Sequence, residues 1–266
     1  MDKFELTTEV QDTLTMLDVN EEPQAYQYLA GLLTNGVVTE DPYIAANNLL
    51  QCDKPEPLSQ TVRDLIVVLF QAAFDAGNAD AMNDLGAQYY DGSRGFEQDY
   101  GKAVEYYNMA AQNGSRQAQE NLGYCYYYGR NVPVDYEKAF HYFALGAFDG
   151  HLISLYKIGD MYANGLYVEK NEKEAFQIYI RCINTMTDEA AEVAAGPIYL
   201  RLGKCFLNGI GVEKDAKAAL MCFQKAESFL YDMVKDGNAM YHNSLKAAVD
   251  GQEKARRILT EELINQ

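Results

Sequence analysis

The sequence has no tryptophan, only three histidines and no apolar run long enough to cross a membrane. Its most apolar stretch, DLIVVLFQ at residues 64–71, is far shorter than the roughly 20 residues that a membrane-spanning helix requires. The first residues, MDKFEL, also lack the basic start and the apolar centre of a secretory signal. We therefore expect a cytoplasmic protein that does not insert into a membrane.

The composition gives little support for metal or disulfide chemistry. The five cysteines are an odd number without a CxxC pair, and no two of the three histidines are four residues apart. Disulfide frameworks and zinc sites depend on paired ligands at such short spacings. We expect no disulfide, no metal and no cofactor, and we interpret Cys125 and Cys205 as small buried side chains.

Basic residues are also scarce. Lysine and arginine number 22 against 39 aspartate and glutamate residues, which gives a formal net charge of −17 and a pI near 4.5. A field of this sign repels phosphates, so we expect no nucleic-acid partner. An acidic surface also keeps a soluble protein dispersed, and we attribute the larger share of the charge to this cause.

What the sequence does contain is one pattern that occurs four times. A leucine or isoleucine is followed by glycine, by an aromatic residue three places later and by a second glycine three places after that. The four copies are LGAQYYDG at 85–92, LGYCYYYG at 122–129, IGDMYANG at 158–165 and LGKCFLNG at 202–209. Their first glycines are 37, 36 and 44 residues apart. Such a period is typical of stacked repeats, whose units cannot bury their apolar faces alone.

Each copy predicts two antiparallel helices joined by a short loop. The leucine and the aromatic residue share one helical face, and the glycine beside the leucine lets a neighbouring helix approach. The second glycine ends the first helix in a left-handed conformation. The second helix begins at a side chain that can accept hydrogen bonds from its first turn. These predicted N-caps are Asp99, Asp135, Asn171 and Asp215, each followed four residues later by a closely packed alanine.

The four repeats are expected to form the middle of one continuous solenoid. They occupy residues 78–236, with approximate bounds of 78–114, 115–150, 151–195 and 196–236. Residues 1–77 are interpreted as a capping helix over 4–18 followed by degenerate copies of the repeat. In these copies Gly36 is expected to end one helix and Asp41-Pro42 to begin the next. Residues 185–195 lengthen the connection between two repeats. Residues 237–266 are expected to form a C-terminal capping helix that runs from Met240 to Ile264.

This combination of residues resembles the Sel1-like repeat, a relative of the tetratricopeptide repeat. The resemblance rests on the repeated leucine-glycine, aromatic, glycine and N-cap positions, and on the loop valines Val132, Val168 and Val212. It implies an all-α fold, a right-handed α/α superhelix, and a role as an adaptor or scaffold in protein complexes. Some members of the family are secreted, carry a disulfide in each repeat and have been linked to penicillin binding, whereas this chain lacks the paired cysteines.

By the same resemblance, the first helix of each repeat lines a concave wall. This wall changes from acidic at its N-terminal end, through a tyrosine patch, to basic in the third and fourth repeats. Tyrosine offers a large apolar area and a hydroxyl at small entropic cost, which suits a peptide-binding surface. The candidate partner-binding residues are Tyr90, Asn121, Tyr124, Tyr127, Tyr128, Lys157, Asn164, Arg201, Lys204 and Asn208.

Two parts of this prediction have structural alternatives. Most of the 21 tyrosines in a chain without tryptophan are expected to pack between helices. Lys157, Arg201 and Lys204 could grip a carboxylate or phosphate together. Alternatively, these cations form salt bridges to Asp160 or Glu192.

One short motif matches a catalytic pattern. Ser154 and Lys157 have the SxxK spacing, in which a lysine can activate a serine nucleophile, but no SDN or KTG motif accompanies them. Ser154 occupies the position of the small residues Ala81 and Ala118 in the earlier repeats. We therefore predict that Ser154 packs between helices and that the protein is not an enzyme. A hydrolase or penicillin-binding-like activity is the alternative.

The sequence favours a scaffold that holds a protein or peptide in a concave groove. A further alternative is a regulator whose acidic convex face binds the partner, which a strong dependence on salt would support. The identity of the partner and the oligomeric state are left open.

Overall fold

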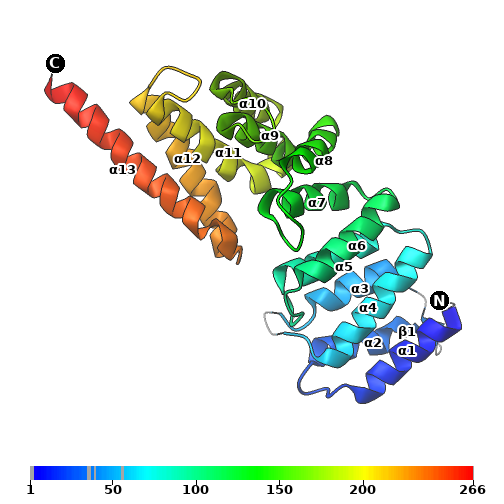
Figure 1. Cartoon of the computed structure of the whole chain (residues 1–266). Coiled ribbons are helices and arrows are strands. Elements are labelled where there is room, and N and C mark those ends of the chain that lie inside the picture. The colour runs from blue at the N-terminus through cyan, green and yellow to red at the C-terminus, as the bar shows by residue number, and fades with distance from the viewer. Residues whose placement is uncertain (1–2, 35–36, 39, 55–56, 266) are drawn as a thin grey trace. The chain divides into compact units, whose positions relative to one another are not determined.

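The computed structural model describes residues 3–34, 37–38, 40–54 and 57–265, and helices make up most of this part of the chain (Figure 1). Successive helices pack as antiparallel pairs, so the fold is an all-α solenoid, as the repeats predict. The chain divides into two compact units, Met1–Asp135 and Tyr136–Gln266. We call them the first and the second unit and describe each by itself.

The first unit consists of helix pairs and one small strand pair. α3 packs against α4, α5 packs against α6, and the N-terminal helix α1 lies on α4. Its elements are α1 (Lys3–Met16), α2 (Pro23–Leu32), β1 (Leu33–Thr34), β2 (Val37–Val38), α3 (Pro42–Gln51), α4 (Gln60–Asp75), α5 (Asp80–Asp91), α6 (Tyr100–Gln112) and α7 (Arg116–Tyr128).

The chain between α1 and α3 departs in part from the expected plan. α1 corresponds to the predicted N-terminal capping helix, and its Val10 is completely buried. After α2, β1 and β2 pair antiparallel with Leu33 opposite Val38, an arrangement that the sequence did not predict. The backbone N–H of Val38 donates to Thr7 Oγ1 at 3.2 Å, so this strand pair is held against α1. Gly36, which was expected to end a helix, lies outside the described residues.

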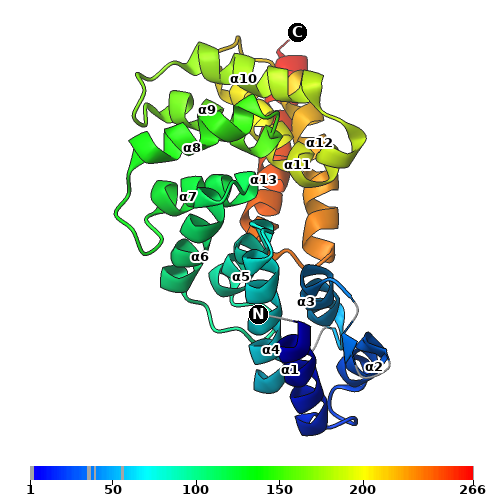
Figure 2. The same cartoon turned by 90° about the vertical axis from the view of Figure 1, so that its right-hand side faces the viewer.

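The second unit contains the remaining helices. α9 packs against α10, α11 against α12, and α13 lies along both α12 and α11; the pairing of α9 with α10 can be followed in Figure 2. The elements are α8 (Tyr136–Phe148), α9 (Leu152–Asn164), α10 (Glu172–Thr185), α11 (Asp188–Asn208), α12 (Ala216–Lys235), a short 3-10 helix (Ala239–Tyr241) and α13 (His242–Ile264). α13 is the long C-terminal helix that the sequence predicts.

The lengthened connection at residues 185–195 is mostly helical. Thr187 accepts a hydrogen bond from the backbone N–H of Ala190 and caps α11, which begins at Asp188. The extra residues therefore extend the first helix of the fourth repeat at its N-terminus. Pro197 lies inside α11 and supplies no backbone N–H, so one hydrogen bond of the helix is missing there.

Most helix ends follow the predicted cap residues. The four glycines that were expected to end the first helices are left-handed, with φ between 64° and 77°; they are Gly92, Gly129, Gly165 and Gly209. The N-cap side chains of α3, α6, α10 and α12 accept hydrogen bonds from backbone N–H groups of the first turn; they are Asp41, Asp99, Asn171 and Asp215. Each such cap contributes about 1 kcal/mol to stability.

The glycine beside the repeat leucine lets an aromatic ring of the second helix reach the backbone of the first. A Cβ atom added at Gly86, Gly159 or Gly203 would lie 2.6–2.8 Å from the ring of Tyr107, Tyr179 or Phe223, respectively. This close approach confirms the role predicted for these glycines. The aromatic residues themselves stand eight places after each N-cap, a regular position that the sequence reading missed.

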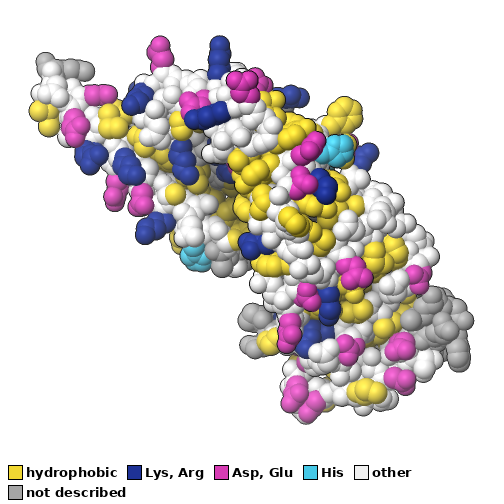
Figure 3. All heavy atoms as spheres, viewed as in Figure 1, with side chains coloured by type: hydrophobic (Ala, Val, Ile, Leu, Met, Phe, Trp, Pro, Cys, Tyr) yellow, Lys and Arg dark blue, Asp and Glu magenta, His cyan; other side chains and the backbone are white. Residues whose placement is uncertain are grey.

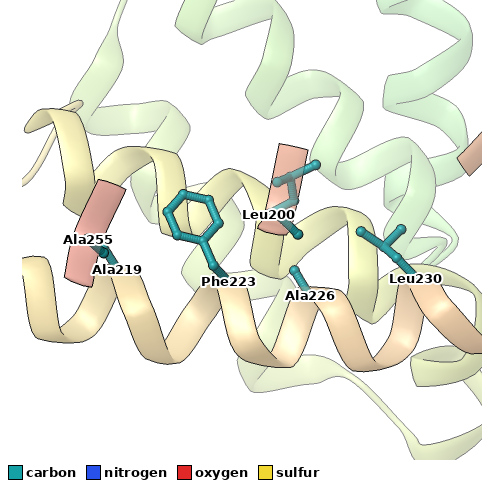
Figure 4. Packing of buried hydrophobic residues seen from close by; sticks show 7 residues of the cluster. Leu200, Ala219, Phe223, Ala226, Leu230 and Ala255 are labelled. Atoms are coloured by element: carbon teal, nitrogen blue, oxygen red, sulfur yellow. The ribbon is translucent and has the colours of Figure 1, made fainter. Parts of the chain in front are cut away.

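Phe223 lies at the centre of the core formed by α11, α12 and α13. The ring is 1% exposed and packs with Leu200 of α11 and with Ala226 and Leu230 of its own helix (Figure 4). A Cβ atom at Gly251 of α13 would lie 2.6 Å from the Cζ atom of the ring. Two glycines on different helices therefore enclose one aromatic side chain.

None of the described helices combines the length and apolar character needed to span a membrane. Within the described residues there is also no group of His, Cys, Asp and Glu side chains that could hold a metal ion. All five cysteines are free thiols, and Cys125 and Cys205 are buried, as predicted.

Candidate partner-binding surface

Six tyrosines of the first unit form one connected group, which we call the tyrosine cluster. At the end of α5, Tyr90 contacts Tyr100 and Tyr107 of α6, with ring centroids 5.1 and 6.4 Å apart. At the end of α7, Tyr128 contacts Tyr127 at 4.8 Å and stacks with Tyr124 at 6.3 Å. The four tyrosines that the sequence singled out therefore belong to one cluster, which also includes Tyr100 and Tyr107.

Arg130 joins the two halves of this cluster. Its guanidinium carbon lies 4.8 Å from the ring centroid of Tyr100 and 5.9 Å from that of Tyr128. At such distances a cation is attracted to the face of an aromatic ring. The Nε atom of Arg130 is buried and has no hydrogen-bond partner in the part of the chain that the structure describes. Contacts with the rings therefore hold this part of the side chain in place.

The cluster is buried on one side and open on the other. Tyr107 is 3% exposed, whereas Tyr128 is 48% exposed. Burial raises the pKa of Tyr107, and it also raises the pKa of Tyr90, although the nearby guanidinium of Arg130 opposes the rise at Tyr90. Both hydroxyls are therefore protonated at neutral pH and can donate as well as accept hydrogen bonds. Packed rings with such hydroxyls are typical anchors of protein interfaces.

Polar side chains of α5 and α7 lie close to the cluster. Asn121, three residues before Tyr124 on α7, donates from Nδ2 to Asn83 Oδ1 on α5 at 2.9 Å. Asp84 on α5 accepts a hydrogen bond from Tyr43 Oη on α3 at 2.7 Å. Asp84 also lines two open hollows of about 390 and 430 Å³. The surface along α5 is thus polar and irregular.

The other five predicted residues belong to the second unit, where Arg201 takes part in an internal ion pair. Its Nε and Nη2 atoms both donate to the carboxylate of Asp160 at 2.5 Å. Asp160 also accepts from Tyr179 Oη at 2.8 Å, and the guanidinium of Arg201 lies 4.3 Å from the ring centroid of Tyr156. The charge of Arg201 is therefore compensated within the protein, which is the structural alternative that the sequence analysis considered.

Lys157 and Lys204 differ in their exposure. Lys157 of α9 is 5% exposed, so an open pocket formed by all three cations does not match this geometry. Lys204 of α11 is exposed, and partial burial together with the nearby charge of Arg201 lowers the pKa of its amine. Asn164 and Asn208 each donate from Nδ2 to a backbone carbonyl of their own helix, at 2.7 and 3.0 Å. Among the predicted cations, Lys204 is the accessible one.

The SxxK motif lies in the packed part of α9. Ser154 is completely buried, and its Oγ atom has no hydrogen-bond partner among the described residues. Lys157 therefore does not hydrogen-bond Ser154, as an activating base would. The burial confirms that Ser154 is a helix-packing residue.

Comparison with protein-family models identifies the Sel1 repeat at residues 79–115, 116–151, 152–181 and 199–228, together half of the chain. The chain therefore belongs to the Sel1 repeat family. Proteins of this family generally act as scaffolds for protein–protein interactions.

Two solved structures with the same fold are similar to this chain. A Sel1 repeat protein from Oxalobacter formigenes is 21% identical, with a TM-score of 0.52 over 87% of this chain and 85% of that one. Protein c5321, described as a protective antigen of uropathogenic Escherichia coli with an SLR fold, is 18% identical, with a TM-score of 0.55. That match covers 97% of this chain but 56% of c5321, so the chain spans little more than half of that protein. A search of curated proteins found no match.

Proposed function

We propose that this protein is a non-enzymatic adaptor that binds a protein or peptide partner through the tyrosine cluster. The observation that carries the proposal is that Tyr124, Tyr127 and Tyr128 contact one another and are linked to Tyr90 through Arg130 and Tyr100. Tyr128 is half exposed at the open side of this group. Membership of a family whose repeats generally serve protein interaction supports the same class of function.

The packing of the cluster favours binding because it limits the entropy lost when a partner docks. Each ring already rests against a neighbouring ring, and the guanidinium carbon of Arg130 lies 4.8 and 5.9 Å from the ring centroids of Tyr100 and Tyr128. A partner side chain that covers Tyr128 therefore buries apolar area without ordering a mobile residue. Asn121 adds an amide on the same helix, whose oxygen can accept a hydrogen bond from a peptide N–H.

In the second unit, taken by itself, Lys204 is the exposed cation that we assign to binding an acidic group. Asn164 and Asn208 are exposed polar residues of the same unit. Lys157 and Arg201 are assigned to internal structure because of their burial and of the ion pair with Asp160.

Two further features belong to the proposal. Absence of catalysis is supported by the burial of Ser154, the serine of the one sequence motif that resembles a nucleophile. A cytoplasmic location is supported by the five free thiols, because thiols persist where the surroundings are reducing.

The proposal is tested by capture of partners from the cells that naturally make the protein. The full chain, a Tyr124→Ala/Tyr128→Ala variant and a Tyr231→Ala variant would be immobilised, and bound proteins quantified by mass spectrometry. Tyr231 is a matched control, because it is a 59% exposed tyrosine on α12 in the other unit. We expect one set of proteins to be retained by the control and lost by the double variant. Equal capture by both variants would show that the cluster is not the contact.

A further inference from the structure

The negative charge of the protein is concentrated in the first unit. Residues 1–135 contain 21 of the 39 acidic residues but 7 of the 22 basic ones, whereas residues 136–266 contain 18 acidic and 15 basic residues. The first unit thus has a net charge of −14, and the second unit has −3. On the face drawn in Figure 3, basic side chains are more numerous over α9–α13 than over α1–α6. Solubility alone would not require the negative charge to be concentrated in one unit.

Several cations of the first unit are engaged by groups other than carboxylates. Arg63 donates to the backbone carbonyl of Leu58, and Arg94 donates from Nε to the carbonyl of Leu50 at 3.0 Å. The amine of Lys102 lies 4.6 Å from the ring centroid of Tyr89. These side chains stabilise loops and helix ends, and the charges of Asp53 and Glu22 also act on Arg94.

α5 carries three aspartates and no basic residue. Asp80, Asp84 and Asp91 are four and seven residues apart, so they lie along one face of the helix. Asp80 accepts from Ser115 Oγ at 2.6 Å, and Asp84 accepts from Tyr43 Oη and from Asn83 Nδ2. All of these donors are neutral. Within the described residues neither Asp84 nor Asp91 forms an ion pair.

This acidic face borders the tyrosine cluster. Asp91 follows Tyr90 directly, and the charges of Asp84 and Asp91 both act on the hydroxyl of Tyr107. Asp91 is also the last residue of α5, where the helix presents its carbonyl groups and favours a positive charge. Asp91 is exposed, so a partner can reach its carboxylate, and desolvation by the neighbouring protein raises its pKa.

We propose that the face of α5 formed by Asp84 and Asp91, together with Tyr90, binds an arginine-bearing segment of a partner protein. This inference rests on the proposed function and specifies the chemistry of the partner at one end of the same surface. A guanidinium group can stack on an aromatic ring while donating two parallel hydrogen bonds to a carboxylate. The guanidinium carbon of Arg130 lies 4.8 Å from the ring centroid of Tyr100, so a ring of this cluster already contacts a guanidinium group.

The inference is tested by selection from a random peptide library displayed on phage, with the immobilised full chain as the target. We expect the selected peptides to be enriched in arginine relative to the unselected library. A synthetic copy of the most frequent peptide should bind an Asp84→Asn/Asp91→Asn variant at least about tenfold more weakly, because two charge-assisted contacts are lost. Asparagine can still accept the hydrogen bond from Tyr43, so the variant retains this contact with α3.

A Glu97→Gln/Glu105→Gln variant is the matched control. It removes two charges from the same unit, at exposed positions before and on α6, and we expect it to change the affinity less than about twofold once salt screens distant charges. Equal weakening by both variants would attribute binding to the overall charge and would overturn the proposed contact.

The outcomes also separate this inference from the proposed function. Selected peptides without arginine enrichment, whose binding is lost in Tyr124→Ala/Tyr128→Ala but not in Asp84→Asn/Asp91→Asn, would overturn the inference and retain the tyrosine cluster as a binding site. Failure to enrich any peptide over the unselected library would count against both.

Discussion

Replacement of Gly203 by alanine is the most direct test of the packing between paired helices. The added Cβ atom would lie 2.6 Å from Cδ1 and 2.7 Å from Cε1 of Phe223. The ring is 1% exposed, and Gly251 of α13 approaches it from a second helix, so the ring has little space into which it can move. The backbone of α11 or the ring of Phe223 must therefore shift.

The expected magnitude follows from two opposing effects. Alanine inside a helix is favoured over glycine by about 1 kcal/mol. Overpacking a well-filled core costs about 1–3 kcal/mol, and the enclosed ring places Gly203→Ala at the upper end of this range. We expect a net loss of about 2 kcal/mol in the free energy of unfolding. For chains of about this length the melting temperature should fall by roughly 4–8 °C.

Thermal unfolding followed by circular dichroism measures this change, and two further variants make the test specific. A Cβ atom at Gly31 of α2 would meet no atom within 4 Å, so Gly31→Ala should stabilise the protein by about 0.5–1 kcal/mol. Phe223→Leu in the Gly203→Ala background should restore part of the loss, because the smaller side chain makes room for the methyl group. The reasoning is refuted if Gly203→Ala stabilises the protein as Gly31→Ala does, or if the effects of Gly203→Ala and Phe223→Leu simply add.

Three other predictions concern charges and thiols. Asp160→Ala should lower the free energy of unfolding by about 3 kcal/mol, because Arg201 and Tyr179 lose their shared acceptor. The control variant Lys204→Ala should change the free energy of unfolding by less than about 0.5 kcal/mol. Similar urea midpoints for the two variants would contradict a stabilising role of the ion pair. Desolvation by the neighbouring protein raises the pKa of the exposed Asp91. The ionised form is therefore disfavoured in the folded state, and Asp91→Asn should be slightly more stable than the parent at neutral pH. This advantage should disappear as the pH falls below the unfolded-state pKa of aspartate, near about 4, and urea titrations that show a constant difference at all pH values would exclude the effect. Burial raises the pKa of Cys125, Cys182 and Cys205 to about 12. At pH 8 these thiols should therefore react with Ellman's reagent much more slowly in the native protein than in urea, and more slowly than the partly exposed Cys52. Rapid reaction of all five thiols in the native protein would contradict the buried positions.

The helix pairs were predictable because their signals are local. A left-handed glycine such as Gly92 and an N-cap such as Asp99 act within one turn of the chain, so their spacing fixes where helices end and begin. The regular period then indicates which helices must stack. The strand pair after α2 was missed because it depends on a distant partner, the hydroxyl of Thr7 on α1. The start of α11 at Asp188 was missed because a helical extension and a loop can both account for the extra residues.

The candidate site was predictable to a smaller extent. The register identified the four tyrosines, since i, i+3 and i+4 positions lie on one helix face. It did not identify Arg130, because no other repeat has a basic residue at that place in the loop; the corresponding residues are Ser93, Leu166 and Ile210. It also did not decide between an open pocket and the ion pair of Arg201 with Asp160. These residues are 41 positions apart, and their contact is set by how closely α9 approaches α11.

Some positions of the repeat serve internal packing and others vary, so the side chains available to a partner differ from one repeat to the next. Positions that recur in the copies are used for internal packing or capping: the glycine, the buried alanine and the aromatic residue eight places after the N-cap. The place after the repeat glycine is not part of this shared packing, and it holds Ala87, Tyr124, Asp160 and Lys204 in the successive copies. In the third copy Asp160 pairs internally with Arg201, whereas the other copies offer a partner different side chains on helix pairs of the same kind. Recognition of a partner by such a protein depends on the positions where the repeats differ. The proposed surface is therefore defined by the aspartates of α5 and the tyrosines of α7, and not by the residues that all repeats share.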